Sequence, residues 1–270
     1  MPRTSFIETK DGTSLFYKDW GAGKPVVFLS NWGLNSDMWQ YQMTPMVSQG
    51  VRCIAYDRRG IGRSSQPWQG YDYDTLADDL ASVIEQLDLH NVMLVSHSMG
   101  GGEVVRYLSR HGSGRIARVV LIAPTTPFLL KTANNPDGLD KSAFEQMRAA
   151  WCKDFPKWVA ENTVPYFAQG TSPEMMQWVA NLALQCPLKT AIDLSQAWSE
   201  TDFRAELPRI TVPTLIIQGD KDTLPIDLTG RKTAPLIRGC QFKVYEGEAH
   251  GLMFTNMDRL NGDLLAFIKG

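Results

Sequence analysis

The feature that most constrains the fold of this chain is the stretch Val-Met-Leu-Val-Ser-His-Ser-Met-Gly-Gly-Gly at residues 92–102. Its apolar, β-branched first half is typical of a buried strand, and the apolar positions of residues 103–108 have helical spacing. A serine in a sharp turn between a strand and a helix is lifted clear of the sheet edge, provided that the residues two before and two after it are small. Ser96 and Gly100 meet that condition. We therefore predict a nucleophile elbow at Ser98 rather than a simple Ser-Gly loop.

Strands and helices alternate on both sides of this stretch. Besides the strand that leads to Ser98, apolar runs predict strands at residues 26–30, 51–56, 119–124, 214–218 and 242–245. Helices are expected at residues 74–87, 227–237 and 252–268. Residues 5–17 alternate around Asp11-Gly12, which predicts an opening β-hairpin. The alternation implies right-handed crossovers, so we predict an α/β fold with a mainly parallel central sheet flanked by helices.

Residues 127–206 interrupt this alternation. They contain no clear strand pattern and are rich in tryptophan and phenylalanine. We predict that this segment forms several short helices. At 270 residues the chain suits one α/β domain with an insertion. We therefore predict an α/β core formed by residues 1–126 and 207–270, with a helical cap insertion at residues 127–206. Most of the cap aromatics are expected to be core, and some to face an apolar pocket of modest size over Ser98.

Composition and charge indicate which classes of binding partner and which cellular compartment to expect. The formal net charge is −2 and no basic cluster occurs, which argues against binding to nucleic acid or to an anionic membrane. The four cysteines have neither metal-ligand nor redox spacing, so we expect reduced thiols, no metal and no cofactor. We find neither a signal-peptide pattern nor an apolar run of membrane-spanning length, which predicts a soluble cytoplasmic protein. The expected partner is a small-molecule substrate, and a homo-oligomer is left open.

A serine hydroxyl becomes an effective nucleophile when a base takes its proton, and the chain has only four histidines to supply that base. His250 lies in a turn-prone segment between the last predicted strand and the last predicted helix. His90 and His111 lie near predicted helix ends, where solvated or capping roles are typical. His97 adjoins Ser98, but an elbow turn aims neighbouring side chains in different directions. We therefore predict His250 as the base, with His97 as the alternative.

The predicted strand at residues 214–218 ends in Gly-Asp-Lys-Asp, which offers an acid to orient that base. A carboxylate after this strand and a histidine after the next one both lie at the carboxyl edge of a parallel sheet, where open α/β sheets build their sites. The order Ser…Asp…His also suits a nucleophile elbow. We predict Asp222 as the acid. Asp220 is the alternative, although it suits a turn-forming role better.

A tetrahedral intermediate requires two hydrogen-bond donors for its oxyanion. The backbone N–H of Met99 follows the nucleophile and lies at a helix start, where such donors are available. The second donor is expected to be the backbone N–H of Trp32, in the loop after the strand at residues 26–30. The arginine-containing loop at residues 57–63 is interpreted as scaffolding rather than as an anion-binding site.

Five segments, residues 56–68, 74–80, 98–107, 199–203 and 263–268, together carry a resemblance to a known family. The chain resembles the cofactor-free haloperoxidase, perhydrolase and aryl esterase family of bacterial α/β-hydrolases. The resemblance implies a triad of Ser98, His250 and Asp222, and an oxyanion hole formed by the amides of Trp32 and Met99. It also implies hydrolysis of esters or lactones without a metal or haem, with peracid formation from hydrogen peroxide as a side activity.

The loop Ser30-Asn31-Trp32-Gly33 departs from the His-Gly-Trp-Pro sequence that is usual in this family. Proline fixes one backbone angle and removes a donor, whereas Gly33 frees the backbone and restores an N–H. We expect the looser loop to hold peroxide less well, so that hydrolysis dominates. A Gly33→Pro substitution is then expected to raise the ratio of peracid formation to hydrolysis, provided that the backbone angles at this position admit proline.

The sequence therefore predicts a serine hydrolase that cleaves small carboxylic esters or lactones through an acyl-enzyme. Ser98 excludes the haloalkane dehalogenases and epoxide hydrolases that share the implied fold, because these need a carboxylate at the elbow. A carbon–carbon bond hydrolase and an amide or lactam hydrolase remain alternatives with the same triad. A ligand-binding receptor built on a hydrolase fold is an alternative of a different class, which would bind a small aryl acetate with little turnover.

Overall fold

The central sheet of the computed structural model, which describes residues 5–270, has eight strands in the order β1-β2-β4-β3-β5-β6-β7-β8. Strands β1 and β2 pair antiparallel at one edge, and the remaining strands are parallel. The strands are β1 Phe6–Glu8, β2 Ser14–Trp20, β3 Lys24–Leu29, β4 Val51–Tyr56, β5 Val92–His97, β6 Ile116–Ile122, β7 Thr214–Gly219 and β8 Gln241–Tyr245. The predicted hairpin and mainly parallel sheet are confirmed.

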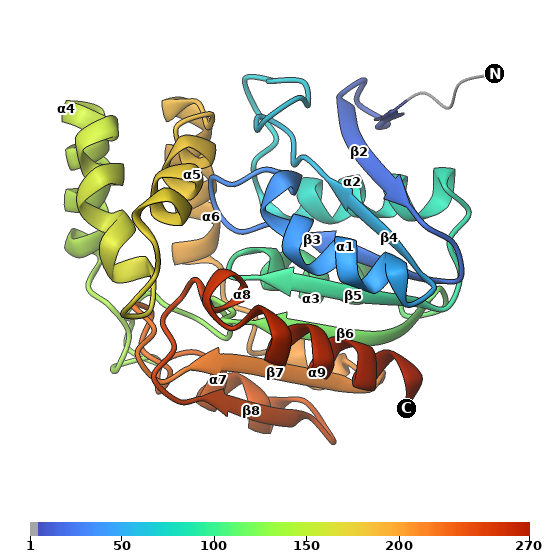
Figure 1. The fold of residues 1–270 in the computed structure, drawn as a ribbon. Coiled ribbons are helices and arrows are strands. Elements are labelled where there is room, and N and C mark those ends of the chain that lie inside the picture. The colour runs from blue at the N-terminus through green and yellow to red at the C-terminus, as the bar shows by residue number, and fades with distance from the viewer. Residues whose placement is uncertain (1–4) are drawn as a thin grey trace.

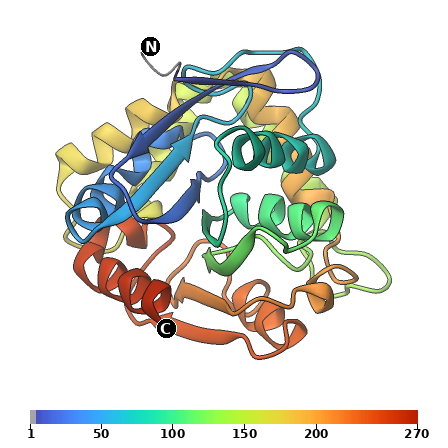
Figure 2. The ribbon, with the colours of Figure 1, turned by 90° about the vertical axis from the view of Figure 1, so that its right-hand side faces the viewer.

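Helices cover both faces of this sheet. In Figure 2, α1 and α9 lie on one face, and α2 and α3 lie on the other. The helices are α1 Gln40–Ser48, α2 Tyr73–Gln86, α3 Gly100–His111, α4 Lys141–Tyr166, α5 Pro173–Ala183, α6 Leu188–Glu200, α7 Gly230–Thr233, α8 Leu252–Thr255 and α9 Met257–Lys269, with short 3₁₀ turns at Ser36–Trp39, Leu207–Arg209 and Ala234–Leu236. Strand β5 is buried along its whole length because both of its faces are covered.

Two helices predicted near the C-terminus are shorter than expected. The helix predicted at residues 227–237 ends after one turn, because Pro235 has no N–H with which to continue it. The closing helix is interrupted at Asn256, whose φ of −126° and ψ of 49° are not helical. The Asn256 side chain instead bonds the carboxylate of Glu248 at 3.1 Å, which stabilises the break between α8 and α9.

Between β6 and β7 the chain forms the three helices α4, α5 and α6, which lie beyond the carboxyl ends of the parallel strands (Figure 1). The first of these consists of two helical segments, because the backbone at Asp154 is not helical, with a φ of −163° and a ψ of 84°. This break lies two residues before Pro156, whose ring is incompatible with a regular preceding turn. The division into a core and a cap at residues 127–206 stays a prediction. Within residues 5–270, no helix is both long and apolar enough to cross a membrane.

Candidate active site

Ser98 lies in the turn that joins β5 to α3, and its backbone φ is +55°. A non-glycine residue in this left-handed region costs about 1–3 kcal/mol and persists only where surrounding bonds enforce it. Here the Ser98 N–H donates to the carbonyl oxygen of Ile122 at 2.9 Å, and its carbonyl accepts from the Gly101 N–H at 3.0 Å. Ser98 is therefore held by the neighbouring strand on one side and by the start of the helix on the other.

The two small residues around Ser98 have the steric role that the sequence predicts. A Cβ atom at Gly100 would lie 2.9 Å from the carbonyl oxygen of Ser30 and 3.0 Å from that of Leu29. Ser96 is fully buried, and its hydroxyl donates to the carbonyl oxygen of Val120. The elbow therefore packs directly against the end of β3, which leads to the loop that carries Trp32.

His250 and Asp222 are hydrogen-bonded to each other. The Nδ1 atom of His250 lies 2.8 Å from Oδ1 of Asp222, and the Asp222 side chain is fully buried. The same carboxylate accepts from the Leu224 N–H at 2.8 Å and from Nε2 of Gln218 at 2.9 Å. Three hydrogen-bond partners therefore hold the buried carboxylate in one orientation. With Nδ1 bonded to Asp222, the other ring nitrogen of His250, Nε2, is left for chemistry.

Asp220, the alternative acid, has a different role. Its carboxylate accepts from the backbone N–H of Gly247, which ties the turn after β7 to the turn after β8. The remaining histidines outside the elbow lie elsewhere: His90 bonds Asp88, and His111 bonds Asp78.

His97 is fully buried beside His250, and their ring centroids are 4.6 Å apart. Its Nε2 atom lies 3.0 Å from the backbone carbonyl oxygen of His250. Because a carbonyl only accepts, this nitrogen carries the proton. Burial, reinforced by the proximity of His250, lowers the pKa of His97 well below the ordinary histidine value, so the ring stays neutral. His97 therefore supports the backbone of the loop that carries His250.

The loop after β3 is anchored through Trp32. Its indole Nε1 donates to the carbonyl oxygen of Ala191 at 2.8 Å, and its ring stacks on Trp151 with centroids 4.5 Å apart. The next residue, Gly33, has a φ of +83°. Proline is restricted to a φ near −65°, so the condition attached to the predicted effect of Gly33→Pro is not met. The expected rise in the ratio of peracid formation to hydrolysis therefore does not apply, and the sequence could not show this because glycine adopts φ of either sign.

The arginines of residues 57–63 each pair with a carboxylate of the chain. Arg59 bonds both carboxylate oxygens of Asp79 at 2.6 Å, and Arg63 bonds Asp57 at 2.8 Å. Arg58 bonds Glu103, at 2.6 Å, and both side chains are almost completely inaccessible to solvent. These pairings agree with the scaffolding interpretation, because the charges are neutralised internally.

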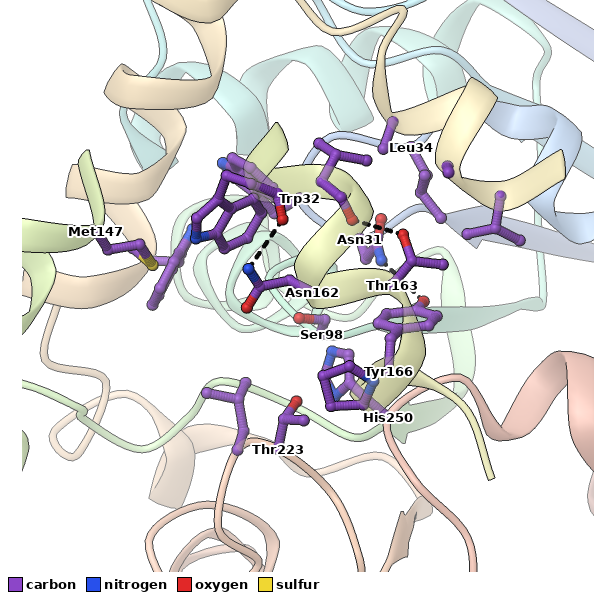
Figure 3. A pocket seen from close by; sticks show the side chains of 18 of the residues that line it. Asn31, Trp32, Leu34, Ser98, Met147, Asn162, Thr163, Tyr166, Thr223 and His250 are labelled. Atoms are coloured by element: carbon purple, nitrogen blue, oxygen red, sulfur yellow. Dashed lines mark hydrogen bonds between the residues drawn. The ribbon is translucent and has the colours of Figure 1, made fainter. Parts of the chain in front are cut away.

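Ser98, His250 and Trp32 line one cavity of about 300 Å³, and Figure 3 shows them around it together with Met147. The wall is largely aromatic and aliphatic, and it is formed mainly by the α4–α6 region. Its lining includes Leu34, Met147, Trp151, Trp158, Val159, Val179, Ala180, Ala183 and Trp198. Such a cavity favours a small ligand with an apolar body.

Sequence reasoning missed two residues beside this site. Tyr166, at the end of α4, packs its ring edge-on against His250 and accepts a hydrogen bond from Asn31 Nδ2 at 3.1 Å. Burial and the charge of Asp222 raise the pKa of the Tyr166 phenol, so it stays protonated. Nothing in the local sequence marks this tyrosine. Gln218, in contrast, carries a signal, because it is a polar residue at the end of an otherwise apolar buried strand.

Comparison with known proteins identifies the family. Residues 24–256 match the model of the alpha/beta hydrolase fold family. A non-heme chloroperoxidase of Kitasatospora aureofaciens is 40% identical over 273 residues, which cover 97% of this chain and 98% of that protein. The chain belongs to the non-heme haloperoxidase and perhydrolase family of α/β-hydrolases.

Two further relatives extend this picture. A bifunctional esterase/perhydrolase of Acinetobacter calcoaceticus is 38% identical over 274 residues, which cover 98% of this chain and 99% of that protein. The crystal structure of a bromoperoxidase from Bacillus anthracis superimposes with a TM-score of 0.94 at 39% identity, covering 98% of this chain and 99% of that chain. The predicted fold and family are therefore confirmed, and the protein is a hydrolase or perhydrolase of this family.

Proposed function

We propose that this hydrolase cleaves small carboxylic esters or lactones through an acyl-enzyme formed on Ser98. One observation carries the proposal: the serine of a strained strand-to-helix turn and a histidine bonded to a buried carboxylate line the same apolar cavity. A serine and its base on one cavity wall, with the base oriented by a third group, are the arrangement that nucleophilic catalysis requires.

In the first half-reaction, the Ser98 Oγ attacks the ester carbonyl while Nε2 of His250 takes its proton. Asp222 holds Nδ1–H of His250, so the correct ring nitrogen is free to act and the imidazolium that forms is stabilised. The tetrahedral intermediate then collapses, His250 gives the proton to the leaving alcohol, and the acyl group stays on Ser98. With a lactone, the leaving alcohol remains attached to the acyl group.

The negative oxygen of the intermediate is stabilised by two backbone N–H groups, those of Met99 and Trp32. Met99 directly precedes α3, so its N–H is among the unpaired donors at the positive end of that helix. Each such donor typically contributes about 2.7–4 kcal/mol of transition-state stabilisation.

In the second half-reaction, water attacks the acyl carbonyl, His250 takes its proton, and Ser98 is released with a carboxylic acid. Hydrogen peroxide in place of water gives a peracid by the same steps, which is the side activity we propose. The curated relative described as a bifunctional esterase/perhydrolase supports both outcomes for this family.

The volume of the cavity limits the size of the acyl group. About 300 Å³, lined largely by apolar side chains, favours small aliphatic or aryl acyl groups over long chains. We therefore expect kcat/KM to fall steeply once the acyl chain exceeds what this volume holds.

The test is a panel of aryl esters of graded acyl length and of lactones, each with and without hydrogen peroxide. We expect turnover of short acyl esters, its loss in Ser98→Ala, and labelling of Ser98 alone by a fluorophosphonate. Labelling at another serine, or full turnover in the alanine variant, contradicts the mechanism. Binding of esters without turnover would instead indicate a receptor, and turnover restricted to amides or to vinylogous diketones would indicate an amide or carbon–carbon bond hydrolase.

A further inference from the structure

We propose that Arg58 is a positioning residue for the oxyanion hole, because it sets the direction of the Trp32 N–H through the peptide unit that contains it. The inference rests on the proposed function, in which that N–H stabilises the oxyanion. Arg58 lies outside the cavity, so its effect on the reaction is exerted through the loop after β3.

The guanidinium of Arg58 bonds two consecutive carbonyl groups of that loop. Its Nη2 donates to the carbonyl oxygen of Ser30 at 2.7 Å, and its Nη1 donates to that of Asn31 at 2.8 Å. Arg58 is 2% exposed, so these bonds do not compete with water. A charged donor in a fixed fork therefore holds both peptide groups in one orientation.

The bond to Asn31 determines where the Trp32 N–H points. The carbonyl of Asn31 and the N–H of Trp32 belong to the same planar trans peptide unit, so they point in opposite directions. With the carbonyl held against Arg58, the N–H of Trp32 is turned away from Arg58. Rotation of this peptide would remove the donor from the oxyanion and leave a buried guanidinium hydrogen without an acceptor.

The other side of Arg58 is tied to the helix that begins beside Ser98. Its Nε donates to Oε1 of Glu103, on the first turn of α3, at 2.6 Å. The second carboxylate oxygen of Glu103 accepts from the Tyr56 hydroxyl at 3.0 Å. Arg58 therefore links the loop that carries one proposed oxyanion donor to the helix start that carries the other.

The chain offers a matched control in the adjacent residue. Arg59 is 1% exposed and its guanidinium is paired with Asp79 on α2 and with Asp11 at 2.8 Å. These two carboxylates belong to α2 and to the β1–β2 turn, and neither is part of the loop after β3. Substitution of either arginine disrupts a buried ion pair and destabilises the fold. Of these two arginines, Arg58 alone bonds the loop after β3, so its substitution rather than that of Arg59 should act on the chemical step.

The experiment compares Arg58→Lys with Arg59→Lys. Lysine keeps the positive charge, but a single nitrogen cannot hold two carbonyl groups and a carboxylate in the fork geometry of arginine. We expect Arg58→Lys to lower kcat for a short acyl ester by about 10- to 100-fold, because a misdirected oxyanion donor is partly lost. KM should change by less than about threefold, since the donor acts in the transition state. Arg59→Lys should keep kcat within about twofold despite a lower Tm.

The double variant R58M/E103M covers the case in which Arg58→Lys fails to fold. Replacing both buried charges with apolar side chains avoids an unpaired charge, and it should still show the low kcat. Wild-type kcat in either folded variant overturns the proposal. An equal loss of kcat in Arg58→Lys and Arg59→Lys at similar Tm also overturns it, because it would reveal a general effect of destabilisation.

A structural readout separates this proposal from the proposed function. If the wild-type protein hydrolyses no ester, the proposed function fails, and the crystal structure of Arg58→Lys still tests the inference. We expect the peptide between Asn31 and Trp32 to be rotated or displaced relative to the wild-type protein. The same peptide in an unchanged orientation overturns the role of Arg58.

Discussion

The imidazole of His97 donates a hydrogen bond to the backbone carbonyl of His250, and the two rings lie 4.6 Å apart. The residue next to the proposed nucleophile therefore supports the backbone of the proposed base. His97 cannot exchange roles with His250, because its Nε2 proton is committed to that carbonyl. The hydrogen-bond partners also distinguish the two rings, because Nε2 of His97 bonds a backbone carbonyl whereas Nδ1 of His250 bonds a carboxylate.

The first prediction separates these two histidines in catalysis. His250→Ala should lower kcat by at least about 10³-fold, because the base and the acid of both half-reactions are lost. His97→Gln retains a side-chain donor for the carbonyl of His250, so it should lower kcat by about tenfold or less. Steady-state kinetics on one aryl ester measure both values. Equal losses in two correctly folded variants would show that the base is wrongly assigned.

The second prediction is that the free energy of unfolding depends on pH, because the pKa of the buried His97 side chain is lowered. Its pKa is depressed in the folded state, whereas an unfolded histidine takes up a proton below about pH 6.5. The unfolded state therefore binds more protons than the native state, so stability is full above pH 6.5 and falls as the pH decreases toward the folded-state pKa.

The measurement is urea unfolding of the wild-type protein and of His97→Gln at pH 7.5 and pH 5.5. Between these pH values the free energy of unfolding of the wild type should fall by up to about 1.4 kcal/mol more than that of the variant, which is the most that one histidine with an unfolded-state pKa of about 6.5 contributes over this range. An identical loss in both proteins would mean that His97 titrates normally when folded.

A third prediction concerns the acid. Asp222→Asn should lower kcat by about 10³- to 10⁴-fold, because an amide can neither stabilise the imidazolium nor fix the ring tautomer. Asp220→Asn is the matched control, since the Asp220 carboxylate bonds the Gly247 N–H rather than His250 and lies two residues away. Its kcat should stay within about threefold of wild type. A larger loss in the Asp220 variant would reverse the assignment.

A fourth prediction follows from the backbone at Gly33. Gly33→Pro should lower hydrolysis and peracid formation together, because proline cannot adopt a φ of +83° and the oxyanion loop must rearrange. An alanine side chain fits at position 33, because the nearest atom to its Cβ is Cys186 Cβ at 4.0 Å. Gly33→Ala should therefore lower the free energy of unfolding by about 1–2 kcal/mol, which is the cost of a left-handed backbone for alanine. Both rates are measured on one short ester at fixed peroxide. A folded proline variant with a raised peracid ratio would show that the loop reaches a different conformation in solution.

The sequence by itself determined the features that depend on neighbouring residues. The strand, the turn and the helix around Ser98 lie within residues 92–102, so their apolar pattern and their small residues define the elbow locally. The positions of Asp222 and His250 followed almost as directly. Each comes after a parallel strand, and parallel strands in one sheet end at the same edge. Alternating apolar segments were likewise sufficient to predict the fold class.

Only the tertiary structure decided the features that join distant segments. Arg58 meets Glu103 across 45 positions, and Asn31 meets Tyr166 across 135. Neither pair has a periodicity or spacing that a sequence displays, because side chains become partners only after the sheet brings their segments together. The sign of φ at Gly33 was likewise decided by the tertiary structure. Glycine admits both signs, and the contacts that fix the loop around it come from other elements of the fold.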